Sequence, residues 1–337
     1  MPKIDLDTYV EHESEIRPAK QKQRRAGRPT YTPGREERLQ ALTDLMTHAD
    51  KLPAEVQASF SPSFRPAEHE RFWLMNNLEG FYINQVITDI LWKAKGGKEA
   101  NVYCCTAHPS TGLELIAAKV YRPRMFRNLR NDARYRQGRE IVNEDGRVVH
   151  SREMVAVRKN TRFGQELRHM SWLETEYQTL QLLYGAGADV PQPITRSGNA
   201  ILMEYVGAER APAPCLNEIS LTRAEARSMF SRLVENLEIM LASHRVHADL
   251  SAYNILYWEG KFTIIDFPQA VDPRRNPDAA DLFQRDVERV CQYFARFGIR
   301  RDPRALAHDL WNRHLLTNAM DGSALGARDM EELAEEA

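Results

Sequence analysis

The stretch from His247 to Asp266 places the strongest constraint on what this chain can fold into. Residues 247–254 read His-Ala-Asp-Leu-Ser-Ala-Tyr-Asn, and eleven further residues separate them from Asp266. Asp249 can orient or deprotonate an attacking hydroxyl, while Asn254 and Asp266 can hold the metal ions that bridge ATP phosphates. The spacing therefore predicts a phosphoryl-transfer site, and the chain must fold so that these three side chains meet.

The residues around this stretch predict a helix, a loop and a hairpin. Apolar residues recur at helical spacing over 225–243, and the loop follows within a few residues. Asn254 opens a short strand, a Glu-Gly turn follows, and residues 262–265 form an apolar, β-branched strand that Asp266 ends. A hairpin would bring Asn254 and Asp266 side by side, as a shared Mg²⁺ requires. The alternative is a plain turn, in which the Asp and Ser side chains satisfy backbone donors.

A second set of residues upstream predicts where phosphates would bind. Residues 115–121 form an apolar strand with Lys119 near its end, and burying a lysine there is costly unless it is paired. We expect Lys119 to contact ATP phosphates and to pair with a carboxylate of the helix Trp172–Tyr184. Glu176 is our first choice for that carboxylate and Glu174 is the reserve. A lysine that snorkels from an edge strand is the alternative.

Two backbone segments would complete a nucleotide site. The Gly-Gly pair at 96–97 lets backbone amides approach phosphate, although a hairpin turn alone would also explain it. Residues 200–207 form an apolar strand that ends at a glycine. In a two-lobed kinase this strand would be the hinge. The backbone groups of Glu204 and Val206 would then bond the adenine edge, and Met203 would line the pocket. The alternative is a plain core strand. The chain has no Gly-Lys-Ser/Thr, which argues against a P-loop NTPase.

These segments together resemble those of the RIO family of atypical serine/threonine protein kinases, in its bacterial-type form. The resemblance covers roughly residues 85–300. The matching strings are Gly-Lys-Glu-Ala-Asn-Val-Tyr (97–103), Ala-Lys-Val-Tyr (118–121), Met-Glu-Tyr-Val-Gly (203–207), Val-His-Ala-Asp-Leu-Ser-Ala-Tyr-Asn-Ile-Leu (246–256), Ile-Ile-Asp-Phe-Pro-Gln-Ala-Val (264–271) and Phe-Gln-Arg-Asp-Val-Glu-Arg-Val-Cys-Gln-Tyr-Phe (283–294).

The resemblance implies an α+β, two-lobed protein-kinase-like fold with a β-rich N-lobe and a mainly helical, truncated C-lobe. Asp249, Asp266 and Lys119 would be catalytic. Asn254 and Asp266 would ligate the metal, and Asp286 would brace the catalytic loop. ATP and Mg²⁺, with Mn²⁺ as an alternative ion, are the implied cofactors. The residues implied to bind the nucleotide are Gly97, Lys98, Val102, Lys119, Glu176, Met203, Glu204, Val206, Ser251, Asn254 and Ile265.

The activity implied is transfer of the ATP γ-phosphate to a protein serine or threonine hydroxyl, or transiently to Asp266 itself in an ATPase-like cycle. A small-molecule kinase of the aminoglycoside-phosphotransferase type shares the His-x-Asp-x-x-x-x-Asn pattern and is the alternative; a nucleotide-gated scaffold is a third reading. Ala248 stands where ordinary protein kinases place an arginine, so we expect no control by a phosphorylated activation loop. Pro268 follows Phe267, and because proline fixes φ this segment should flip less easily.

Composition limits the class of protein and its compartment. The chain has 337 residues, 42% hydrophobic and 28% charged, which is enough for a two-lobed core with terminal extensions. A net charge of −1 gives no global drive towards nucleic acid. The four cysteines show no metal-ligand spacing, and no signal peptide or apolar run of eighteen residues appears. We therefore expect a cytoplasmic protein without a membrane segment.

The chain is predicted to divide into five parts. Residues 13–40 are basic, and this arm would contact RNA or a ribonucleoprotein particle or would be a solvated tail. Residues 65–93 read as helical. Residues 122–168 carry many arginines and few large apolar residues, which predicts a loop, and RIO kinases have a mobile loop at the matching place. The parts are a flexible basic arm (1–60), a helical extension (61–95), a kinase N-lobe with mobile loop 122–168 (96–207), a C-lobe (208–327) and an acidic tail (328–337).

Overall fold

The computed structural model describes residues 60–97, 99–122, 138, 141–142, 147–149, 152–159 and 161–316. All of these belong to one unit of the chain, Leu45–Ala337. The predicted basic arm up to residue 59, the acidic tail and much of the segment 122–151 lie outside the described residues. The five-part division of the chain stays a prediction.

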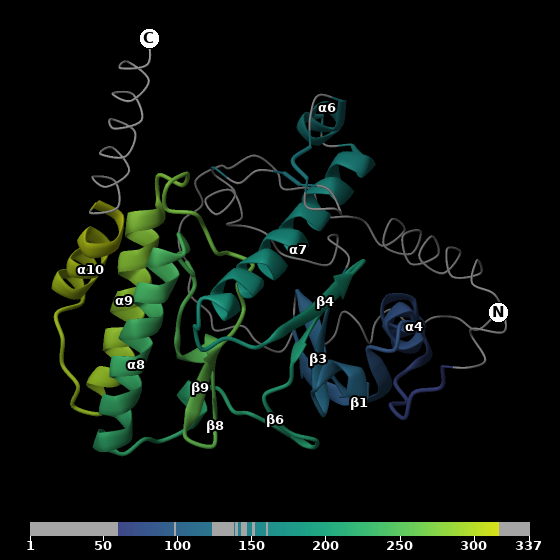
Figure 1. Cartoon of the computed structure of the whole chain (residues 1–337), viewed down its shortest axis with the longest axis horizontal. Coiled ribbons are helices and arrows are strands. Elements are labelled where there is room, and N and C mark those ends of the chain that lie inside the picture. Colours follow the sequence, from purple (N-terminus) through teal and green to yellow (C-terminus); the bar gives the residue numbers. More distant parts are fainter. Residues whose placement is uncertain are drawn as a thin grey trace, which may run out of the picture. The chain divides into compact units, whose positions relative to one another are not determined.

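A five-stranded antiparallel sheet forms the first part of the fold (Figure 1). The strand order is β1-β2-β3-β5-β4, so the first three strands pair in chain order and β5 lies between β3 and β4. The strands are β1 (Ile87–Gly96), β2 (Ala100–Ala107), β3 (Leu115–Tyr121), β4 (Pro193–Ser197) and β5 (Ala200–Glu204).

Alternation along β3 decides where its lysine lies. Successive side chains of a strand point to opposite faces of the sheet. Ile116 and Val120 pack in the cluster formed with helix α4 (Glu68–Ile83), whereas Tyr121 packs with Leu173 of helix α7 (Arg162–Gly185). Lys119 therefore shares the face of Tyr121 and is directed towards α7 rather than towards α4.

Two predictions for the N-terminal half were wrong. Residues 65–93 are not one helix, because α4 ends at Ile83, Gln85 has a positive φ of 54° and β1 begins at Ile87. The β-branched and aromatic residues that follow pair with β2 instead. The part of 122–168 that the structure describes also includes helix, namely α6 (Arg152–Arg158) and the start of α7.

Helix α7 is longer than predicted because two local signals extend it. Thr161 caps its N-terminus by accepting from the Gly164 N–H, and Leu167 packs in a small cluster with Val157 of α6 and with Val149. The predicted helix Trp172–Tyr184 is confirmed as the C-terminal half of α7. This half packs against the sheet through Leu173, which clusters with Tyr121 of β3 and Ile201 of β5, and it carries the glutamates considered for the lysine.

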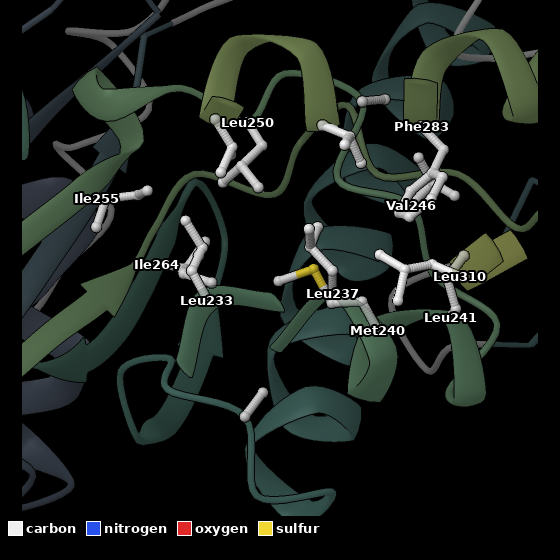
Figure 2. Packing of buried hydrophobic residues seen from close by; sticks show 14 of the residues in the cluster. Leu233, Leu237, Met240, Leu241, Val246, Leu250, Ile255, Ile264, Phe283 and Leu310 are labelled. Carbon is white, nitrogen blue, oxygen red and sulfur yellow. The ribbon is translucent and has the colours of Figure 1, made fainter. Parts of the chain in front are cut away.

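The second part is mainly helical, and its buried core includes Leu250 of the predicted loop (Figure 2). The predicted helix 225–243 is confirmed as α8 (Arg223–Ala242), and its buried Leu233, Leu237 and Met240 pack towards Leu250 of the loop. The remaining elements are β6 (Gly207–Ala208), β7 (Ala211–Pro212), β8 (Ile255–Trp258), β9 (Lys261–Ile264), α9 (Ala279–Ala295), α10 (Pro303–Trp311), the π-helical η5 (Asn312–Leu316) and the 3₁₀ turns η1 (Pro109–Thr111), η3 (Leu216–Glu218) and η4 (Ala252–Asn254).

The expected α+β, two-lobed architecture is confirmed, with an antiparallel sheet followed by a helical part. Among the described residues, no helix has the length and apolar character that a bilayer crossing demands.

Candidate active site

Lys119 joins the two parts of the fold. Its Nζ lies 2.7 Å from Glu176 Oε1 on α7 and 2.7 Å from Asp266 Oδ1 in the segment after β9. Desolvation lowers the pKa of Lys119, but the charges of Asp266 and Glu176 outweigh it and hold that pKa well above its usual value. The lysine therefore remains a cation although only 13% of its side chain is exposed.

The choice between the two glutamates is settled by their partners. Glu176 contacts Lys119, whereas Glu174 pairs with Arg196 of β4 and accepts from Gln178. Tyr121, which sequence reasoning missed, donates its hydroxyl to the second oxygen of Glu176, and its ring centroid lies 5.1 Å from the Lys119 ammonium. Both oxygens of Glu176 are thus occupied, which fixes the direction of the lysine.

The predicted loop holds its backbone through a buried histidine. The His247 Nδ1 accepts from the Asp249 N–H at 3.3 Å, so the ring proton is on Nε2, which donates to the Ile265 carbonyl at 3.1 Å. Burial lowers the pKa of His247, which keeps this tautomer neutral. The histidine therefore ties the segment of Asp249 to the segment that precedes Asp266.

Asp286 of α9 braces the same loop, as the resemblance implies. Its carboxylate accepts from the Ala248 N–H at 2.7 Å and from the Leu250 N–H at 2.9 Å, and it is almost fully buried. Burial raises the pKa of Asp286 to about 7, against the opposing effect of the two backbone donors. Ala248 has a positive φ of 65°, a strained conformation that the two hydrogen bonds enforce.

Asn254 and Asp266 lie at the open end of the β8–β9 hairpin, as predicted. The Ile265 N–H donates to the Asn254 carbonyl at 3.0 Å, and the Asn254 Nδ2 donates to the Asp249 carbonyl at 2.9 Å. The amide oxygen of Asn254 is therefore turned away from the loop. Asp266 adopts a positive φ of 75°, and 43% of its side chain is exposed.

This donor set fits a magnesium ion. Mg²⁺ takes oxygen ligands and commonly only one or two from protein, with phosphates and water completing the shell. The amide oxygen of Asn254 and the carboxylate of Asp266 provide such a pair. Desolvation raises the pKa of Asp266, but Lys119 outweighs it and the net pKa is lowered, so the carboxylate is ionised. In keeping with so few protein ligands, the described residues contain no cluster of three or more His, Cys, Asp or Glu side chains that would hold a metal alone.

The sheet supplies an apolar surface next to these polar groups. Val102 of β2, Ala117 of β3 and Met203 of β5 pack in one cluster with Tyr205. The turn from β1 to β2 passes through Gly97, where a Cβ would lie 2.7 Å from the Ala100 carbonyl oxygen, so glycine is required. Lys98, predicted to bind the nucleotide, lies outside the described residues.

The expected hinge contacts are only partly available. The Glu204 N–H donates to the Gln192 carbonyl at 2.8 Å, and the Val206 carbonyl accepts from the Ala213 N–H at 3.0 Å. Within the described part of the chain, the Val206 N–H makes no hydrogen bond. Of the backbone groups predicted to meet adenine, the Glu204 N–H and the Val206 carbonyl are therefore already bonded and the Val206 N–H is free.

The other predicted nucleotide residues lie around the loop and hairpin. The Ser251 carbonyl accepts from the Asn254 N–H at 2.9 Å, which forms the 3₁₀ turn before β8. Ile265 is half-buried, and its carbonyl accepts from the His247 ring. These contacts show positions only, and the binding roles of the two residues stay predictions.

Two charged residues near the site were missed by sequence reasoning. Lys95, near the end of β1, has its Nζ 3.9 Å from Cys215 Sγ, and its charge contributes to the lowered pKa of Asp266. Arg289 of α9 has its Nη1 2.8 Å from Asp249 Oδ1. The Gly-Gly turn beside Lys95 is a signal that could have drawn attention to it, whereas Arg289 carries no local signal.

The fold and the site together define the class of protein. A protein-kinase-like fold has three features that are present here: a sheet with a paired lysine, a helical part, and an Asp-Asn-Asp set between them. A RIO domain model matches residues 101–306, which is more than half of the chain. The chain belongs to the RIO family.

Individual relatives agree with the family match. The chain is 35% identical over 132 residues to the RIO-type serine/threonine-protein kinase Rio1 of Thermoplasma acidophilum, covering 39% of this chain and 68% of that one. It is 30% identical over 210 residues to the serine/threonine-protein kinase RIO1 of Caenorhabditis elegans, covering 60% of this chain. The chain spans only 36% of the length of the C. elegans relative and 39% of its Schizosaccharomyces pombe relative.

A solved structure also resembles the chain. The Rio2 kinase–ADP/Mg²⁺–phosphoaspartate complex from Chaetomium thermophilum aligns with a TM-score of 0.49 and 18% identity, covering 73% of this chain and 70% of that chain. The family assignment rests on the domain match and the sequence relatives rather than on this likeness.

Proposed function

We propose that this chain is an ATP- and Mg²⁺-dependent phosphotransferase that acts as a serine/threonine protein kinase or as an ATPase. The observation that carries the proposal is the 2.7 Å contact of Lys119 with Asp266, which brings the strand lysine to the hairpin beside Asn254 and the Asp249 loop. Membership of the RIO family, whose relatives are named serine/threonine-protein kinases, favours this activity over the small-molecule kinase alternative.

The binding step uses the residues of the sheet. The adenine lies on the apolar surface of Val102, Ala117 and Met203, and the free Val206 N–H donates to its edge. Lys119 donates to phosphate oxygens while Glu176 keeps the ammonium in place. A bound Mg²⁺ or Mn²⁺ supplies charge neutralisation for the phosphates.

The transfer step uses the loop and hairpin. Asp249 orients the acceptor hydroxyl and takes its proton as the new P–O bond forms and ADP leaves. In the ATPase branch, a carboxylate oxygen of Asp266 attacks the γ-phosphorus, the bond to the β-phosphate oxygen breaks and ADP leaves. Water then cleaves the acyl phosphate, which releases phosphate and restores the carboxylate.

Labelling with γ-labelled ATP and Mg²⁺ tests both branches. A hydroxylamine-labile label that Asp266→Asn abolishes supports the acyl-phosphate branch, and an acid-stable label that Asp249→Ala abolishes supports transfer to a hydroxyl. Asp309→Asn, an exposed aspartate of α10, is the matched control and should behave like wild type. Absence of label and of released phosphate in the wild type would refute the proposed activity.

The acceptor and surroundings complete the proposal. A protein hydroxyl is the acceptor that the names of the relatives favour. Contact with RNA or a ribonucleoprotein particle through residues 13–40 stays a prediction, and those residues lie outside the described ones. A cytoplasmic location is likewise a prediction from composition.

A further inference from the structure

Three polar side chains of helix α9 bond to the catalytic loop, two of them to its backbone and the third to a side chain. Arg285 donates to the Ala248 carbonyl, and Asp286 accepts from two backbone N–H groups of the loop. These contacts hold the backbone. Arg289, one turn further along the helix, contacts the Asp249 carboxylate instead, with its Nη1 2.8 Å from Oδ1. It is therefore placed to set the direction of the side chain that the proposed chemistry uses.

The geometry of this contact leaves the carboxylate usable. A single N–H···O bond engages Oδ1, and within the described residues Oδ2 has no hydrogen-bond partner. A charge-assisted hydrogen bond is strong enough to select one rotamer of a short side chain. Oδ2 is thereby presented to an incoming hydroxyl, in a pair whose two side chains are each 38% exposed.

The ion pair between Arg289 and Asp249 contributes little to the stability of the fold. Ion pairs at this exposure contribute little to stability because water screens them and two side chains lose freedom. The loop backbone is held without Arg289, through Asp286 and Arg285. Removing Arg289 should therefore leave the loop folded and release only the Asp249 side chain.

We propose that Arg289 is a positioning residue for Asp249, holding its carboxylate in the orientation that receives the acceptor hydroxyl. The inference rests on the proposed phosphotransferase function. Misplacing a reacting group by about 1 Å can slow a reaction by the order of 100-fold. Binding of ATP does not depend on that orientation, so the effect belongs to kcat and not to KM.

The test compares Arg289→Ala, Arg289→Lys and the control Arg296→Ala in the full chain. Arg296 is an arginine at the other end of the same helix, where it lies over the rings of Tyr293 and Phe297. We expect kcat for transfer to a hydroxyl, followed as acid-stable label from γ-labelled ATP, to fall roughly tenfold or more in Arg289→Ala, with KM for ATP and the thermal midpoint unchanged. Arg289→Lys, or guanidinium added to Arg289→Ala, should restore part of kcat.

The outcomes separate this proposal from the proposed function. An active wild type with an equally active Arg289→Ala would overturn the positioning role. So would a fall in kcat that comes with a lower thermal midpoint and that neither lysine nor guanidinium relieves. A wild type without turnover would instead remove the phosphotransferase function, and the positioning role with it.

Discussion

Lys119 lies between two carboxylates, and the energetics of the three groups depend on their burial. The lysine and Glu176 are 13% and 5% exposed. Removing one partner of a buried pair leaves an uncompensated charge in a poorly solvated place. We expect Lys119→Met to lower the free energy of unfolding by about 3 kcal/mol, measured by urea denaturation at pH 7.

The matched control is Lys93→Met on β1. Its ion pair with Glu70 has the same kind of geometry, 2.8 Å, but the lysine is 35% exposed. Because water reaches this pair more easily than it reaches Lys119 and Glu176, it should contribute less to stability, about 1 kcal/mol. Equal losses in the two variants would show that burial does not set the energetics of Lys119.

Asp286 makes stability depend on pH. Its pKa is raised to about 7 in the folded chain, against a usual value of 3.8, so the folded state binds a proton that the unfolded state releases. Stability from this group is present below the unfolded pKa and is lost as pH rises through 7. Between pH 5 and pH 8 the unfolding free energy of the wild type should therefore fall by roughly 2–3 kcal/mol relative to that of Asp286→Asn, which lacks the titrating group. A difference that is constant with pH would contradict this.

Lys95 should assist nucleotide binding through its charge. It is exposed beside the Gly-Gly turn, and its positive charge helps to lower the pKa of Asp266. We expect Lys95→Met to raise KM for ATP by roughly threefold to tenfold at low salt, and by less at high salt because screening weakens the interaction. Steady-state kinetics of ATP turnover at two salt concentrations measure this. Lys93→Met is the control. An equal rise in KM for ATP in both variants would show that net charge, and not the position of Lys95, sets the effect.

The residues that were predictable are those whose signals are local. Asp249, Asn254 and Asp266 lie within one motif, and Lys119 is conspicuous in an apolar strand. Arg289 escaped because its partner is forty residues away in the chain, and helical periodicity marks only the buried face of α9. A contact formed by folding leaves no pattern in the neighbouring residues.

Among the elements, helix α8 has both a buried apolar face and a capping box at its N-terminus. Thr222 accepts from the Glu225 N–H, and the Glu225 carboxylate accepts in return from the Thr222 N–H. We expect Thr222→Ala to lower the free energy of unfolding by about 1 kcal/mol, because the Glu225 N–H loses its acceptor. Ser228→Ala, exposed in the middle of the same helix, should change it by less than about 0.5 kcal/mol. Denaturation curves that rank the two variants in the reverse order would contradict the role of the cap.

The strand β1 shows why element predictions fail at boundaries. Residues 65–93 have apolar spacing that a helix can use, and α4 does use its first half. What ends the helix is a local feature, Gln85 in a left-handed conformation, followed by pairing with β2. Pairing partners are set by the tertiary fold, so propensity alone did not separate the two elements. Helix α8, in contrast, was predictable because its apolar period is long and uninterrupted.

For the whole molecule, the Lys119–Asp266 contact joins the sheet to the helical part, so a ligand bound there should stabilise both. ADP with Mg²⁺ at 100 times its dissociation constant should raise the free energy of unfolding by about 3 kcal/mol. A single thermal transition that shifts upward with ligand concentration would show this. In Asp266→Asn the part of the shift that needs Mg²⁺ should disappear. Separate transitions for the two parts, with only one of them shifted, would contradict the expectation.

The positive φ angles of Ala248 and Asp266 set a limit for anyone who wishes to make this protein more heat-resistant. Each such position costs roughly 1–3 kcal/mol that the surrounding hydrogen bonds must offset. Ala248→Gly would relieve one of them, and a search for stabilising substitutions would select it. The relief would come from loosening the loop that presents Asp249, so thermostability gained there would be gained at the expense of turnover.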